Sequence, residues 1–174
     1  LVDVHGNTII PLTANQAILP PSDNMLRLAK VEKKQIAKAY YDLDAEVMVR
    51  IPSSEKGKFG AFSHNLAPVS LDDELYFIDK KGNKVIGGLS KAFLSNEGYR
   101  VVQKGSAFGA IDSTGAVVIP IEYTNSLTSV NNGRLGVQKN ASWFYVDMKG
   151  QIVSDKYDRI GKRSEERRVG KECR

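Results

Sequence analysis

The chain of 174 residues is poor in the side chains on which most enzyme chemistry depends. It has one cysteine, one tryptophan and two histidines, and aromatic residues make up 8% of it. The cysteine is Cys173, next to the end of the chain, so the rest of the sequence offers no disulfide, thiol nucleophile or thiolate metal ligand. No apolar run approaches the roughly 18 to 20 residues of a membrane-spanning helix, and we expect no such segment.

The two ends of the chain say little about the native protein. The first residue is Leu1 rather than methionine, and no basic start or long apolar stretch follows it. We therefore expect that the true N-terminus is missing. Residues 163–174 have no apolar periodicity and resemble the in-frame translation of a common short-read sequencing adapter. We interpret them as a non-native, disordered tail, with a natural basic tail as the alternative.

Setting the tail aside changes the charge of the protein. Without its five basic and three acidic residues, the formal net charge falls from +5 to +3. A charge of that size does not indicate nucleic-acid binding. Cysteine usage does not decide the compartment, and our expectation is a bacterial cell envelope or secreted location.

One sequence unit recurs along residues 1–162. Its clearest copy, from Phe108 to Tyr123, reads aromatic-Gly, then an Asp-x-x-Gly turn, then Val-Val-Ile-Pro and a tyrosine. The turn aspartates of five copies are spaced 39, 37, 33 and 35 residues apart, at Asp3, Asp42, Asp79, Asp112 and Asp147. This spacing indicates about five tandem repeats of roughly 35 to 39 residues, of which the first and last are incomplete.

A second landmark falls between these turns. Asn or Gly stands just before a short strand-like run at Asn65-Leu66, at Gly98-Tyr99 and at Gly133-Arg134, and more loosely at Asn24-Met25. Both residue types tolerate a positive φ, which a tight turn entering a strand requires.

Each unit reads as a three-stranded meander. Residues 99–103 and 107–112 are rich in β-formers and flank a short turn, and a third strand at 117–119 is expected to end at Pro120. The Asp-x-x-Gly segment suits a type I turn closed by a bulge. The sequence therefore predicts an all-β fold, a tandem array of antiparallel hairpin or meander repeats that is either an open superhelix or propeller-like.

Residues 25–41 fit two interpretations. One side of an amphipathic helix would carry roughly Leu28, Val31, Gln35, Ile36 and Ala39. In the repeat frame, the same residues are two strands joined by a turn at Lys33-Lys34. We follow the repeat frame, because tertiary context routinely overrides helix propensity.

The second unit departs from the frame at Ala45, which stands where the other units have glycine. A bulged turn needs a positive φ at that place, so we expect this unit to have a different turn or to be the loosest. On the same reasoning, Ala45→Gly should stabilise the protein. β-Branched replacements should destabilise it at the three glycines Gly82, Gly115 and Gly150.

These residues resemble the WG-repeat family of bacterial proteins. The likeness covers most of residues 1–160, although the aromatic-Gly dyad that names the family survives cleanly only as Phe108-Gly109. Trp143 is followed by Phe144, and Tyr76 by another phenylalanine. The resemblance implies an all-β tandem array that acts as an interaction module rather than as an enzyme.

The search for chemistry finds no catalytic residue, no metal site and no cofactor motif. His5 and His64 lie inside repeat turns. Residues 42–46 alternate acidic groups like a calcium loop but lack its glycine and distal glutamate. Asp72-Asp73-Glu74 is a paired-carboxylate candidate for acid–base work at a hairpin tip, where simple solvation is the more ordinary interpretation.

Recurring aromatic residues are the one feature that suggests binding. They either stack into the core between repeats or form a ladder of exposed rings for sugars or peptides, and we favour the core. The set is Phe77, Phe108, Tyr123, Trp143, Tyr145 and Tyr157.

Two functions remain open, and no binding residue can be assigned to either. The first is a non-catalytic bacterial scaffold that binds an unknown protein, peptide or glycan. The alternative is a truncated fragment of an enzyme, in which the repeats are an accessory targeting region.

Overall fold

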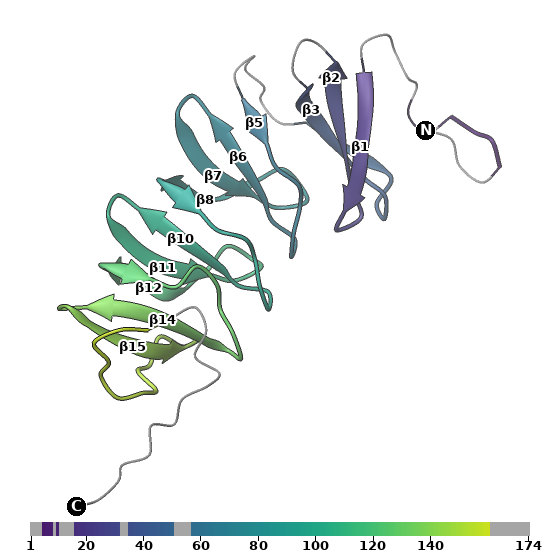
Figure 1. Ribbon diagram of the computed structural model, residues 1–174. Coiled ribbons are helices and arrows are strands. Elements are labelled where there is room, and N and C mark those ends of the chain that lie inside the picture. Colours follow the sequence, from purple (N-terminus) through teal and green to yellow (C-terminus); the bar gives the residue numbers. More distant parts are fainter. Residues whose placement is uncertain (1–4, 9, 11–15, 32–34, 51–56, 161–174) are drawn as a thin grey trace, which may run out of the picture.

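The structure is a computed structural model of the chain, and it describes residues 5–8, 10, 16–31, 35–50 and 57–160. Over these residues the fold is all-β, with no helical residue and with fifteen strands in four antiparallel sheets. The sheets follow one another along an open arc (Figure 1). Of the two predicted alternatives, the open array is the one observed among the described residues.

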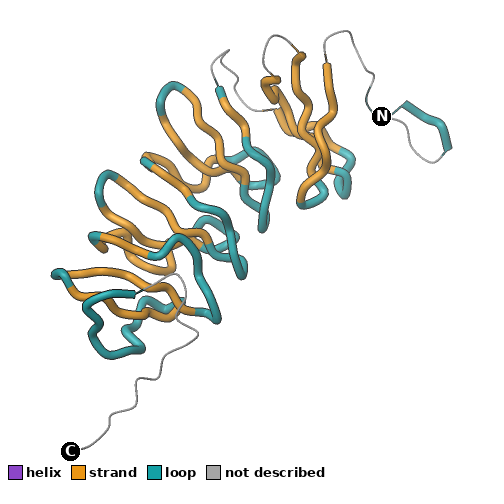
Figure 2. Tube along the Cα trace, in the orientation of Figure 1, coloured by secondary structure: helices purple, strands orange, loops and turns teal. Residues whose placement is uncertain are grey.

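The strands are short, and each sheet is a meander in which sequence neighbours pair (Figure 2). The first sheet contains β1 (Gln16–Ser22), β2 (Met25–Val31), β3 (Gln35–Asp42) and β4 (Val47–Arg50). The second contains β5 (Lys58–Phe59), β6 (Ala67–Leu71), β7 (Glu74–Ile78) and β8 (Lys84–Leu89). The third contains β9 (Lys91–Ala92), β10 (Arg100–Lys104), β11 (Ala107–Ile111) and β12 (Val117–Tyr123). The fourth contains β13 (Asn125–Ser126), β14 (Arg134–Lys139) and β15 (Ser142–Asp147).

The first three sheets have one strand more than the three-stranded meander predicted from the sequence. The short strands β5, β9 and β13 each add to the edge of a hairpin. In the fourth sheet, residues 151–157 take the place of β8 and β12 through two bridges, Trp143 to Tyr157 and Val146 to Ile152. Residues 25–31 and 35–42 form β2 and β3, so the strand interpretation is confirmed and the helix interpretation was wrong. The turn proposed at 33–34 lies outside the described residues.

The hydrophobic core lies between the sheets. Tyr40 of the first sheet and Val69 of the second share one core. Phe77 of the second sheet and Ile111 of the third share the next, and Val101 of the third lies in the core that joins it to the fourth. Because a strand sends alternate side chains to opposite faces, each inner sheet has one face toward the preceding sheet and one toward the following sheet. We call these its N-terminal and C-terminal faces.

The Asp-x-x-Gly turns have the predicted geometry. The Gly115 N–H donates to the Asp112 carbonyl at 3.1 Å, and the Asp112 N–H donates to the Ala116 carbonyl at 3.0 Å. The Asp112 carboxylate also accepts the N–H groups of Thr114 and Ala116. The glycine lies at φ 87°. Asp79 and Asp147 repeat the pattern, so the aspartate fixes the loop and the glycine supplies the left-handed residue.

The second landmark is a row of two-residue turns on one side of the array. In each, both central residues have positive φ, which defines a type I′ hairpin. These pairs are Asp23-Asn24, His64-Asn65, Glu97-Gly98 and Asn132-Gly133.

Neighbouring turns of this row are joined by hydrogen bonds. The Asp23 carboxylate accepts the Asn65 N–H at 2.7 Å. The Glu97 carboxylate accepts the N–H groups of Asn132 and Gly133 at 2.7 and 2.8 Å. A side chain of one turn thereby stabilises the strained backbone of the next and sets the spacing of the sheets.

The turn between β3 and β4 of the first sheet differs from the Asp-x-x-Gly turn of the other sheets. Asp42 pairs with Val47, so this loop has one residue more than the loops closed by Gly82 and Gly115. The left-handed residue is Glu46, at φ 55°, and not Ala45. The expectation of a different turn is confirmed, whereas the assignment of Ala45 to the glycine position was wrong by one residue.

Pro120 does not end the third strand as predicted, because β12 continues to Tyr123. The strand lies at the edge of its sheet, where a missing N–H costs no ladder hydrogen bond. Its register shifts between the pairs Ala110–Ile119 and Phe108–Tyr123, so the proline sits in a bulge. The tail proposed at 163–174 lies outside the described residues.

Replacing Gly115 should destabilise the array. A Cβ at this position would lie 2.7 Å from the Val85 Cγ2, and the positive φ adds backbone strain. We expect Gly115→Val to lower the free energy of unfolding by about 1 to 3 kcal/mol in urea titrations. Gly105 has a positive φ but open space around it, so Gly105→Asn serves as the control. We expect it to change the free energy of unfolding by less than about 1 kcal/mol. Equal losses in the two variants would contradict the packing argument.

Relieving the strain at Glu46 should stabilise the first sheet. Glu46→Gly supplies a residue that adopts positive φ without steric cost, and we expect a gain of a few tenths to about 1 kcal/mol. Ala45 does not have a positive φ, so Ala45→Gly should give no gain. Thermal melts of the two variants decide between the positions. If Ala45→Gly alone raised the stability, residue 45 would correspond to the turn glycine of the other units.

Candidate functional site

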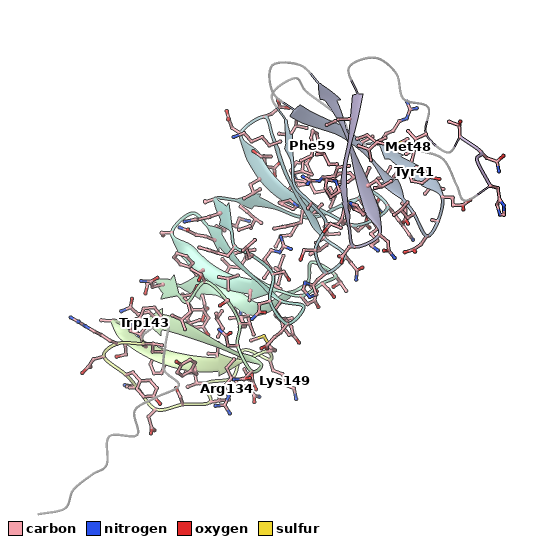
Figure 3. The ribbon with its side chains drawn as sticks, turned by 45° about the vertical axis from the view of Figure 1, so that its right-hand side comes forward. Tyr41, Met48, Phe59, Arg134, Trp143 and Lys149 are labelled. Atoms are coloured by element: carbon pink, nitrogen blue, oxygen red, sulfur yellow. The ribbon has the colours of Figure 1, made fainter. Side chains whose placement is uncertain are left out.

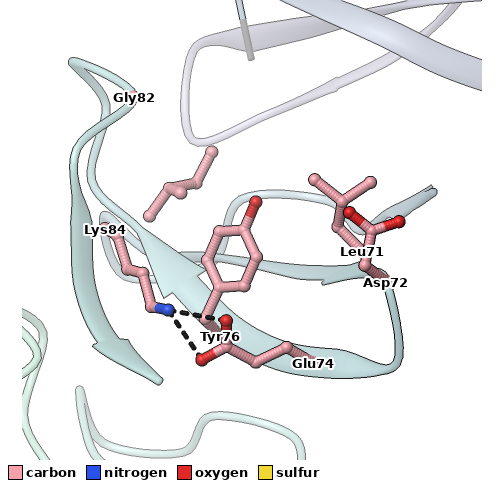
Figure 4. Close-up of a pocket in the computed structure, with 7 residues that line it drawn as sticks. Leu71, Asp72, Glu74, Tyr76, Gly82 and Lys84 are labelled. Carbon is pink, nitrogen blue, oxygen red and sulfur yellow. Dashed lines mark hydrogen bonds and ion pairs between the residues drawn. The ribbon is translucent and has the colours of Figure 1, made fainter. Parts of the chain in front are cut away.

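A surface pocket lies beside the second sheet, next to the first. It has a volume of about 370 Å³ and is lined by Leu71, Asp72, Glu74, Tyr76, Ile78, Gly82 and Lys84 (Figure 4). Gly82 marks its border with the first sheet, because a Cβ there would lie 2.9 Å from the Val49 Cγ1. The lining residues all belong to the second sheet, on its side toward the first.

The polar wall of the pocket is an ion pair. The Lys84 Nζ donates to both Glu74 carboxylate oxygens at 2.6 and 2.7 Å and lies 4.9 Å from the centre of the Tyr76 ring. The Gly88 N–H also donates to the Glu74 carboxylate at 3.0 Å. These hydrogen bonds, first that from Lys84, lower the pKa of Glu74. Burial raises the pKa of the Tyr76 phenol, so at neutral pH the carboxylate is ionised and the phenol keeps its proton.

Strand pairing shows that Tyr76 is the second residue of the dyad in its repeat, whereas the sequence indicated the first. Phe108 and Leu75 hold matching register positions, so Leu75 is the first residue of the dyad in the second sheet. Tyr76 therefore corresponds to Gly109, the glycine of the dyad, and not to Phe108. The prediction that Tyr76 begins a dyad was wrong.

The second and third sheets fill the space beside this position in opposite ways. In the third sheet, a Cβ on Gly109 would lie 2.8 Å from the Ile121 Cα, and Ile121 of the bulged strand packs into the core. In the second sheet the large residue is Tyr76 and the bulged strand carries glycine. A Cβ on Gly87 would lie 2.3 Å from the Lys84 Cε, so the lysine occupies the freed space. Sequence reasoning missed this exchange, since it depends on which residues face each other across a bulge.

The three acidic residues at the hairpin tip do not act as one group. Asp72 and Asp73 are exposed and form the turn, each with a positive φ. Glu74 alone is paired, to Lys84. The three carboxylates therefore face different surroundings and do not form one site.

The remaining sequence candidates fall on turns. The Asp42 carboxylate accepts the N–H groups of Asp44 and Ala45, and Asp44 accepts the Asn24 amide. His64 Nδ1 lies 2.9 Å from the Ser95 Oγ, within the row of type I′ turns. In the part of the chain that the structure describes, no three His, Cys, Asp or Glu side chains gather to hold a metal ion. Nor does that part contain a helix long and apolar enough to cross a membrane.

The recurring aromatic residues divide into two groups. Phe77 and Tyr123 are buried and Phe108 is half-buried, all in cores between sheets. In the last sheet, Trp143 and Tyr145 are half-buried and Tyr157 is exposed. Figure 3 shows Trp143 at the C-terminal end of the array. The core interpretation is confirmed for the inner sheets, and the rings of the last sheet form a surface.

Stacked antiparallel sheets joined by equivalent turns define a β-repeat protein. Residues 108–143, from the Phe108-Gly109 dyad to Trp143, match the family model described as WG containing repeat. The resemblance of the sequence to the WG-repeat family is thereby confirmed over this segment.

Other comparisons add little. No curated protein matches the chain. Among solved structures, one similar chain is a protein of unknown function from Bacteroides caccae, at 12% sequence identity and a TM-score of 0.31. The match covers 79% of this chain and 56% of that one, so the chain spans little more than half the length of that protein.

Two of the turn aspartates, Asp79 and Asp112, should make the array sensitive to acid. Burial raises the pKa of Asp112, but hydrogen bonds from Thr114, Ala116 and Gly115 outweigh it and lower the pKa. A lowered pKa gives stability that is complete above the ordinary value of about 3.9 and is lost as the pH falls below it. We expect Asp112→Asn to cost about 1 kcal/mol or less at neutral pH and to flatten the loss of stability below about pH 4.

Urea titrations between neutral and strongly acidic pH measure this effect. Asp155→Asn, at an exposed position, is the control and should leave the pH profile unchanged. If Asp112→Asn keeps the full acid sensitivity of the parent, the turn carboxylate is not its source.

Proposed function

We propose that this chain is a non-catalytic repeat scaffold that binds a segment of another protein or a glycan, with the pocket at Tyr76 as a contact point. The observation that supports it most directly is the pocket itself, an open hollow of about 370 Å³ with an apolar floor and an ion-paired wall. A hollow of that size accommodates one side chain or one sugar ring. A cell-envelope or secreted location is part of the same proposal.

The electrostatics of the pocket favour binding over catalysis. A general acid at neutral pH needs a raised carboxyl pKa, and the pKa of Glu74 is lowered. A general base needs a lowered phenol pKa, and the pKa of Tyr76 is raised. Both groups are instead suited to fixed hydrogen bonding.

An extended peptide fits the surroundings of the pocket better than a glycan. β8 lies at the edge of the second sheet, and its Gly87-Gly88 bulge runs beside the pocket. A peptide that lies along such an edge can place one side chain in the hollow. Leu71 and Ile78 supply apolar contact, and the Glu74–Lys84 pair in the wall offers one charge of each sign to the end of that side chain.

Panning the full chain against a phage-displayed random peptide library, beside a glycan array, tests this proposal. We expect enriched peptides whose binding weakens by about tenfold or more in Lys84→Ala, because this change opens the Glu74 pair and uncovers the Tyr76 ring. Lys139→Ala is a matched control, since Lys139 forms an equally exposed ion pair with Glu122, at 2.7 Å, in another part of the array.

Each outcome has a definite meaning. Peptides that lose affinity in Lys84→Ala but not in Lys139→Ala support the pocket. Selective glycan binding with the same dependence supports the scaffold but replaces the peptide. Equal effects of both lysine variants, or no ligand from either screen, contradict the site.

A further inference from the structure

One turn in the middle of the row of type I′ turns has backbone donors that the array does not use. The turn is Glu97-Gly98, and its two residues have φ of 52° and 79°. Successive N–H groups of such a turn form a small concavity that binds anions. No described residue accepts a hydrogen bond from the N–H groups of Glu97 and Gly98.

The equivalent turn of the fourth sheet shows what such a donor pair binds. This turn is Asn132-Gly133, and its N–H groups donate to the two carboxylate oxygens of Glu97 at 2.7 and 2.8 Å. The Asp23 carboxylate is held in a similar way by one N–H group, that of Asn65, at 2.7 Å. The row therefore contains two carboxylates bound by turns of the same type as Glu97-Gly98.

The residue at position 64 explains why the turn at Glu97-Gly98 binds no carboxylate of the chain itself. His64 is the first residue of its turn, the place that Asp23 holds in the first sheet and Glu97 in the third. Its Nδ1 lies 2.9 Å from the Oγ of Ser95, which stands two residues before Glu97. An imidazole in place of a carboxylate thus leaves the next turn without its acceptor.

The turn is accessible and lies near a buried positive charge. Glu97 is exposed, and a Cβ on Gly98 would meet no atom within 4 Å. Arg100 follows two residues later and is 6% exposed, and its Nη2 donates to the Ser63 carbonyl, next to His64, at 3.2 Å. A guanidinium keeps its charge when it is buried, and here its hydrogen-bond partner is a neutral carbonyl. The local field therefore favours an anion.

We propose that the Glu97-Gly98 turn binds a carboxylate supplied by an Asp or Glu side chain of a partner protein. The two carboxylates that the row already holds belong to side chains of this kind, which favours a protein over an acidic sugar as the source. The site is separate from the pocket at Tyr76, which lies beside the second sheet, and does not depend on it.

Titrating the nitrogen-15-labelled full chain with acetate, at constant ionic strength, tests the site by amide NMR. We expect the amide protons of Glu97 and Gly98 to move downfield and to saturate, with a dissociation constant of about 1 to 100 mM for two charge-assisted hydrogen bonds. The amides of Asn132 and Gly133 should not move, because the Glu97 carboxylate already occupies them. Acetamide has a similar shape but no charge and should move neither pair.

His64→Glu gives the second sheet the carboxylate that the first and third sheets have at this place. We expect it to fill the site from within, so that acetate binds about tenfold more weakly or worse. The amides of Glu97 and Gly98 should then lie downfield without any ligand. His64→Gln is the matched control, because its side chain has the same length but no charge, and it should keep the acetate affinity within about threefold. Thermal melts establish that both variants fold, and the titration of the parent decides the proposal without them.

A blocked peptide with one central glutamate and free glucuronate distinguish the two sources of a carboxylate. We expect the peptide to move the amides of Glu97 and Gly98 and to bind at least as tightly as acetate, with glucuronate weaker. Tighter binding of glucuronate would assign the site to an acidic glycan and would overturn the protein partner.

Two further results would overturn the site itself. One is a parent in which acetate leaves the amides of Glu97 and Gly98 unmoved, or moves those of Asn132 and Gly133 equally. The other is an equal loss of acetate binding in His64→Glu and His64→Gln, which would show that the charge at this place has no part in it.

Discussion

The whole architecture depends on one constraint, which is that a sheet of three or four short strands cannot bury its apolar side chains alone. Each inner sheet buries these side chains by packing between two neighbouring sheets. Val101 and Val102 are neighbours on β10, point in opposite directions and are both buried, one against the fourth sheet and one against the second. The strands therefore read as continuous apolar runs, and the stacking of successive sheets follows from that pattern.

The turns were the part of the fold that could be predicted from the sequence. Asp112 and Gly115 have local roles, a carboxylate that accepts nearby N–H groups and a residue at positive φ, and local roles leave a signature in a single sequence. The same holds for Asn65 and Gly133 in the type I′ turns. From the spacing of such turns, the order of the main strands of each unit could be inferred, whereas the short edge strands β5, β9 and β13 were missed.

The candidate site could not be predicted, because it depends on pairing across strands. Tyr76 and Gly87 lie on different strands, and only their register shows that a large residue on one replaces a large residue on the other. A one-residue extension of the loop at Glu46 was likewise invisible, since the acidic spacing looked regular without it. Register is set by bulges, and a bulge is a property of two strands rather than of one sequence segment.

The hydrogen bonds between neighbouring type I′ turns also influence how fast the backbone amide protons exchange with solvent. Each of its hydrogen bonds joins a sheet to its neighbour alone, as Glu97 joins the third sheet to the fourth. An outer sheet can open by giving up one interface, whereas an inner sheet must give up two. Protection against exchange should therefore form a gradient along the chain, with the slowest amides in β7, β10 and β11 and progressively faster exchange toward both ends.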